Sequence, residues 1–137
     1  MKVLTINNID MLNHSSKGPM LSLYLSVDTS LHTSKTIDQR FRDLLNKAEF
    51  YLLKDYPRSL VNQFVDSLNK EHDNLISMLS SFDKGIAIFQ EIKGGFIDLK
   101  VIKLQSEIQD LVVVANSFHV KPLLRIKKYV GGYFILT

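Results

Sequence analysis

The sequence contains no cysteine. This absence excludes disulfide bridges, thiolate zinc sites and thiol catalysis, and it fits a reducing compartment. No apolar run approaches the roughly 20 residues that a helix needs to cross a bilayer. The N-terminus (MKVLTIN) has neither a sustained apolar region nor a small-residue cleavage site, so it does not resemble a signal peptide. We therefore expect a cytoplasmic protein without a membrane partner.

The composition is that of a globular protein, with 45% hydrophobic and 23% charged residues in 137. This length suits one domain. The charge is unevenly distributed, because residues 1–110 hold 13 basic and 14 acidic side chains, whereas residues 111–137 hold four basic and no acidic ones. A segment of one sign on a near-neutral body is a candidate contact for a polyanion. The alternative is a solvated helix face with cations near a helix C-terminus.

Hydrophobic spacing predicts an α+β domain. The predicted strands are residues 20–27, 85–90, 96–104 and 111–115. The last of them is a continuous apolar run, which favours a central position in the sheet. With the helices described next, this pattern predicts a two-layer fold, in which a mostly antiparallel or mixed sheet of four to five strands packs against two or three helices.

Apolar residues at three- and four-residue spacing predict two long helices. The first runs from Thr36 to about Lys54, with Thr36 as its N-cap in a capping box. Its buried side includes Phe41 and Leu45. The second begins at Pro57 and extends to about residue 80, with a polar stretch at 69–74 that could break or bend it. One or two further helical turns are expected within residues 7–13.

The sequence shows no catalytic constellation. No two of the four histidines have the spacing of metal ligands, and His72 lies on the apolar stripe of its helix, where we expect a partly buried structural residue. The glycine pairs at 94–95 and 131–132 lack the spacing of a nucleotide-binding loop and are predicted turns. We therefore expect no enzymatic activity, no cofactor and no metal.

Charged residues near the start of the first long helix have two interpretations. Asp38 and Arg42 lie four positions apart and predict an ion pair on the helix surface. Arg40, together with Lys35, could instead extend a surface that faces phosphates.

A basic helix is predicted from Lys121-Pro122 to about Lys128. Lys121, Arg125 and Lys128 are four and three positions apart, so they share one helix face, whereas Lys127 lies to the side. This face is the main candidate for a contact with RNA.

Several segments together resemble the N-terminal domain of the archaeo-eukaryotic class-1 peptide chain release factor superfamily, and in particular its bacterial members. They are residues 21–25 (LSLYL), 38–49 (DQRFRDLLNKAE), 84–89 (KGIAIF), 112–119 (VVVANSFH), 121–124 (KPLL) and 133–136 (YFIL). The resemblance extends over roughly residues 20–137. It implies a non-catalytic module of a three-domain protein, which binds the ribosome or rRNA in translation termination or rescue.

The resemblance is partial at the motifs that read stop codons. Of the Asn-Ile-Lys-Ser loop only Lys35 corresponds, and of the Tyr-x-Cys-x-x-x-Phe signature only Phe118 remains. Stop-codon recognition through those contacts is therefore not implied. The candidate RNA-binding residues are Lys121, Arg125, Lys128, Lys35 and Arg40. The alternative is a protein-interaction or regulatory domain that kept the fold without RNA binding.

The resemblance also suggests a domain border. Residues 1–130 would form the release-factor-like domain, and residues 131–137 the first strand of a following domain. Tyr133, Phe134 and Ile135 are apolar and need backbone partners, so weak self-association through a sheet edge is expected. We expect no DNA partner.

Overall fold

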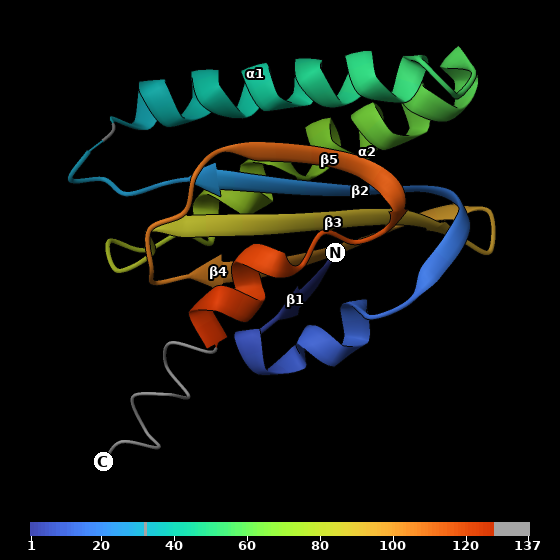
Figure 1. Cartoon of the computed structure of the whole chain (residues 1–137). Helices are drawn as coiled ribbons and strands as arrows, with labels where there is room; N and C mark the ends of the chain where they lie inside the picture. The colour runs from blue at the N-terminus through green and yellow to red at the C-terminus, as the bar shows by residue number, and fades with distance from the viewer. Residues whose placement is uncertain (32, 128–137) are drawn as a thin grey trace.

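The computed structural model describes residues 1–31 and 33–127 (Figure 1). Lys128, Tyr133, Phe134 and Ile135, and with them the predicted domain border, lie outside the described residues. The centre of the fold is a five-stranded sheet in the order β1-β4-β3-β2-β5. Its strands are β1 (Lys2–Leu4), β2 (Ser15–Ser26), β3 (Gly85–Lys93), β4 (Phe96–Leu104) and β5 (Leu111–Ser117). β1 pairs with β4 in parallel and the other pairs are antiparallel, which confirms the predicted mixed sheet and α+β class.

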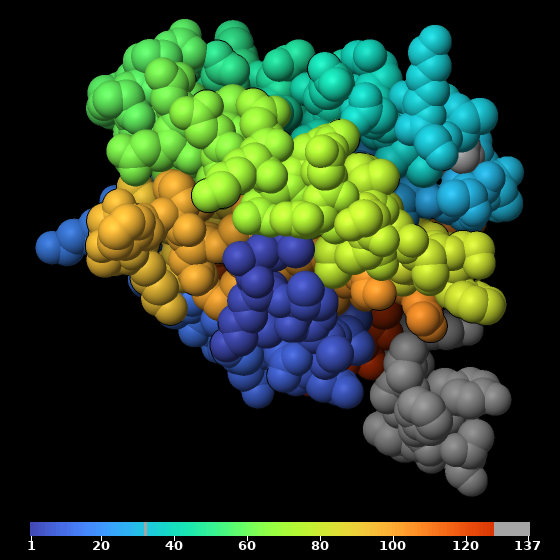
Figure 2. Space-filling view, turned by 180° about the vertical axis from the view of Figure 1, so that it is seen from behind, coloured from blue at the N-terminus to red at the C-terminus, as the bar shows by residue number. Residues whose placement is uncertain are grey.

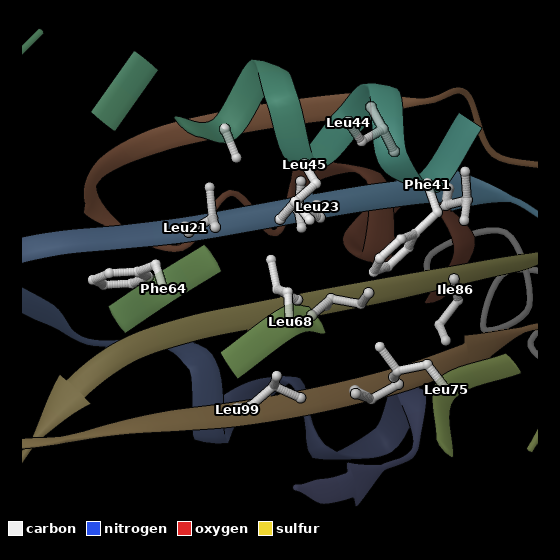
Figure 3. Packing of buried hydrophobic residues seen from close by; sticks show 14 of the residues in the cluster. Leu21, Leu23, Phe41, Leu44, Leu45, Phe64, Leu68, Leu75, Ile86 and Leu99 are labelled. Carbon is white, nitrogen blue, oxygen red and sulfur yellow. The ribbon is translucent and has the colours of Figure 1, made fainter. Parts of the chain in front are cut away.

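Two long helices, α1 (Ser34–Leu53) and α2 (Arg58–Ser77), cover one face of the sheet (Figure 1). Phe41 and Leu45 of α1 are buried, as predicted, and their side chains point toward the sheet (Figure 3). α2 continues through the polar stretch at 69–74, because Leu68 and Leu75 on either side are both buried against the same core. No helix within the described residues is long and apolar enough to cross a bilayer.

The N-cap of α1 is Thr33 and not Thr36, which corrects the predicted start of this helix. The backbone N–H of Thr36 donates to the Thr33 hydroxyl at 3.2 Å, and the two hydroxyls lie 2.8 Å apart. A Thr that accepts from the residue three positions later satisfies one of the free N–H groups of the first turn. The helix therefore begins one turn earlier than the capping-box pattern predicted.

The opposite face of the sheet carries a second, smaller apolar cluster. It is covered by a 3₁₀ helix, η1 (Ile6–Leu12), and by a short helix at residues 121–127 (Figure 1). Ile9 and Leu12 of η1 are buried, and Leu123 of the last helix is completely buried. Seen from behind, the N-terminal segment lies beside β4 and below α2 (Figure 2).

Within residues 1–31 and 33–127, β5 is an edge strand that pairs only with β2, so the predicted central position of residues 111–115 is wrong there. Val112 and Val114 are partly buried against the core beneath the helices. Helix packing therefore accounts for apolar residues in this strand without a second strand beside it. The central strand is β3, which pairs with both β2 and β4.

Candidate functional site

A cleft of about 480 Å³ lies between the β4–β5 connection and the last helix. The residues that line it are Glu107, Ile108, Gln109, Asp110, Leu111, His119, Lys121, Pro122, Arg125 and Ile126. It thus combines two cations, two acids, an amide and several apolar side chains. A hollow of this size, with apolar walls and a few polar groups, is typical of a binding site.

Buried residues of β2 fix the entry to the last helix. The hydroxyl of Tyr24 donates to the carbonyl of His119, and the N–H of His119 donates to the hydroxyl of Ser22 at 2.9 Å. Both β2 side chains are completely buried. Burial raises the pKa of Tyr24, so this phenol keeps its proton and remains a donor. His119, at the edge of the cleft, is therefore held from both sides of its peptide backbone.

The last helix presents its cations outward because its apolar side is anchored. Leu123 is completely buried in the second cluster, whereas Lys121 and Arg125 are exposed and both line the cleft. The predicted shared face of these two residues is therefore confirmed. Lys127 is exposed but is not part of the cleft lining, in agreement with its predicted place at the side of the helix.

Arg40 is engaged by the protein itself. Its guanidinium pairs with the carboxylate of Asp110 and donates to the carbonyl of Ser26 at 2.9 Å. Asp110 also accepts from the N–H of Ser26 at 2.9 Å. These bonds connect α1 to the end of β2 and to the start of β5. They also compensate the charge of Arg40, so a contact between this residue and RNA would compete with an existing ion pair.

Lys35 lies apart from the other candidates. It is exposed on the first turn of α1 and is not among the residues that line the cleft. Four of the predicted RNA-binding residues lie within the described part of the chain. Of these four, only Lys121 and Arg125 line the same cleft.

A second polar cluster joins α1 to α2 through a contact between Asp38 and His72, which the sequence did not predict. Nε2 of His72 lies 2.5 Å from Oδ1 of Asp38, and Nε of Arg42 lies 3.3 Å from Oδ2 of Asp38. The hydrogen bond from His72, followed by the charge of Arg42, lowers the pKa of Asp38. The predicted ion pair between Asp38 and Arg42 is thus confirmed. His72, whose side chain is 24% exposed, is partly buried, as predicted.

Asp38 and His72 border a separate cleft of about 430 Å³, whose apolar lining includes Val27, Ile37 and Ile76. No linear pattern could have shown the pairing of Asp38 with His72, because 34 positions separate them. Across residues 1–31 and 33–127, no three His, Asp or Glu side chains form a group that could hold a metal ion.

No protein-family model matches the chain, and no curated protein matches it.

Proposed function

We propose that this chain is a non-catalytic RNA-binding module of the bacterial release-factor type, which acts in the cytoplasm on the ribosome or its RNA in termination or rescue. The observation that carries the proposal is the pair of exposed cations, Lys121 and Arg125, on a helix that Leu123 anchors to the sheet. The resemblance of residues 20–137 to release-factor N-terminal domains supplies the ribosome as the partner.

The charge around this helix supports a contact with phosphates. Residues 111–127 contain Lys121, Arg125 and Lys127 and no acidic residue. Of the two acids in the cleft, Asp110 is compensated by Arg40, which leaves Glu107. The helix therefore presents a net positive surface, and such a surface binds phosphate groups with release of counterions.

Salt-dependent binding of the full chain to ribosomes and to structured rRNA fragments tests the proposal. About three phosphate contacts predict a log-log salt slope of roughly −2 to −3. Neutralising two of them, in Lys121→Gln/Arg125→Gln, should reduce that slope by roughly 1.5 to 2 and weaken binding at low salt. The fold should be retained, because both side chains are exposed.

A matched control removes the same charge elsewhere. Lys47 of α1 and Lys70 of α2 are exposed and belong to the helix layer on the other face of the sheet. Lys47→Gln/Lys70→Gln should bind like the parent. Equal binding by the parent and the Lys121/Arg125 variant would refute the RNA-binding role and favour a protein-interaction domain. Equal losses in both variants would show attraction by net charge alone.

A further inference from the structure

The cleft beside the last helix is chemically asymmetric. The helix contributes the cations Lys121 and Arg125, whereas the β4–β5 connection contributes Glu107 and Gln109. Apolar side chains, among them Ile108, come from both elements. A ligand that satisfies all three kinds of group needs an anionic part, a flat or apolar part, and a polar edge that donates hydrogen bonds.

We propose that this cleft holds one unpaired nucleotide of a single-stranded RNA, an inference that rests on the proposed function and gives its substrate class. The phosphate contacts Lys121 and Arg125, and the base lies between the apolar side chains with its polar edge toward Glu107 and Gln109. The volume of about 480 Å³ lies within the range of roughly 300–1,000 Å³ that is usual for small-ligand sites. A base within a duplex stays stacked and paired, so only a single-stranded or looped-out base can enter.

The acidic side of the cleft determines which bases fit. An ionised carboxylate only accepts hydrogen bonds, so Glu107 favours a base edge with an amino group. Cytosine, adenine and guanine carry an exocyclic amino group, whereas uracil has none and its N3–H donor lies between two carbonyl oxygens that repel a carboxylate. The amide of Gln109 both donates and accepts, so it can pair with any of the four bases. We therefore expect uracil to be the weakest ligand.

Both sides of the cleft are fixed by the core. His119 is held through its backbone by Tyr24 and Ser22 of β2. On the other side, Ile108 packs directly on the backbone of β3, because a Cβ at Gly85 would lie only 2.5 Å from Cγ2 of Ile108. A site whose groups are held in place before binding loses less conformational entropy when the ligand arrives.

Amide chemical shifts of the full chain, titrated with AMP, GMP, CMP and UMP, test this inference. Inorganic phosphate and ribose 5-phosphate serve as probes without a base. We expect the three amino-bearing nucleotides to shift residues 107–111 and 119–126, and UMP to bind about three- to tenfold more weakly, which is the effect of one hydrogen bond. The two base-free probes should shift only residues around Lys121 and Arg125.

Two variants separate the base from the phosphate. Glu107→Gln should remove the preference for the amino-bearing nucleotides over UMP, whereas Lys121→Gln should weaken the binding of all four nucleotides alike. Asp66→Asn, an exposed acid on α2, is the control for the loss of one negative charge and should leave the preference unchanged. The nucleotide site would be overturned if Glu107→Gln still bound UMP more weakly than the other nucleotides. It would also be overturned if inorganic phosphate alone caused the same chemical-shift changes as the nucleotides.

The outcomes also separate this inference from the proposed function. Ribosome binding by a chain that no nucleotide shifts would refute the nucleotide site and leave the proposed function standing. Nucleotide binding by a chain that does not bind ribosomes would keep the site and refute the ribosomal role.

Discussion

Truncation of Phe41 is the sharpest test of how α1 packs on the sheet. The ring is 4% exposed and points from the helix toward the sheet (Figure 3). A buried aromatic side chain removes about 150–250 Å² from water. At about 25 cal/mol per Å², this burial corresponds to roughly 4–6 kcal/mol. Because alanine keeps part of that area and the site relaxes in part, we expect Phe41→Ala to lower the free energy of unfolding by about 3–5 kcal/mol.

Urea denaturation followed by circular dichroism can measure this loss. A chain of 137 residues has an expected stability of roughly 7–20 kcal/mol, so the variant should still fold in the absence of urea. The midpoint should fall while the slope of the transition stays the same, because the surface exposed on unfolding hardly changes.

Phe50 provides the matched control on the same helix. Its side chain is 62% exposed, and its ring lies 4.9 Å from Nζ of Lys54. Phe50→Ala removes an exposed cation–π contact and little buried area, so we expect a cost of at most about 1 kcal/mol. A cost below about 1 kcal/mol for Phe41→Ala, or equal costs for the two variants, would show that the buried face of α1 is assigned wrongly.

Two further predictions concern the last helix and the Asp38 cluster. Leu123→Ala should cost about 2–5 kcal/mol in urea denaturation because Leu123 is completely buried. Its neighbour Leu124 is 49% exposed, so Leu124→Ala should cost much less, and similar losses would contradict the anchoring of this helix. The folded-state pKa of Asp38 lies below its ordinary value of 3.8, so its carboxylate stabilises the fold above that value and loses this contribution as the pH falls through the lowered pKa. Asp38→Asn should therefore lower the free energy of unfolding at neutral pH. Below about pH 4, the free energy of unfolding should decrease less steeply with falling pH in the variant than in the parent. Parallel stability–pH curves for the parent and the variant would refute this role.

Strong local periodicity made several elements predictable from the sequence. The second strand of the hairpin was predicted at residues 96–104, and β4 spans Phe96–Leu104. The three- and four-residue spacing around Phe41 and Leu45 identified the buried side of α1. In both cases the pattern lies within one element, so no knowledge of its neighbours was needed.

Strand order was harder to predict because it depends on distant pairing. The apolar run of β5 reflects packing on the faces of the sheet, whereas its edge position depends on how many strands bond to its backbone. β1 was not predicted at all. It has three residues, of which only Leu4 is buried, and it exists through parallel pairing with β4 almost 100 positions later.

The difference between local patterns and distant contacts also explains which charged residues could be assigned to a surface from the sequence. Lys121 and Arg125 share a face because helical geometry alone sets their spacing. The compensation of Arg40 by Asp110 joins residues 70 positions apart, and it depends on where α1 meets the start of β5.

Lys100 is a further case in which strand register decides the role of a charge. The alternation of β4 does not show that its side chain is buried, yet Lys100 is 4% exposed and pairs with Asp98, while Glu91 lies 3.8 Å away. Lysine is almost never buried without a charged partner. Here the hairpin register supplies Glu91 opposite Asp98, and Nε2 of His14, 77 positions away, binds Glu91 at 2.8 Å. Whether a charged side chain is available to a ligand can therefore be judged only once strand register shows which charges are already paired within the fold. Among the predicted cations, Arg40 is compensated in this way, whereas Lys121 and Arg125 remain exposed beside the cleft, which is why the proposed RNA contact rests on them.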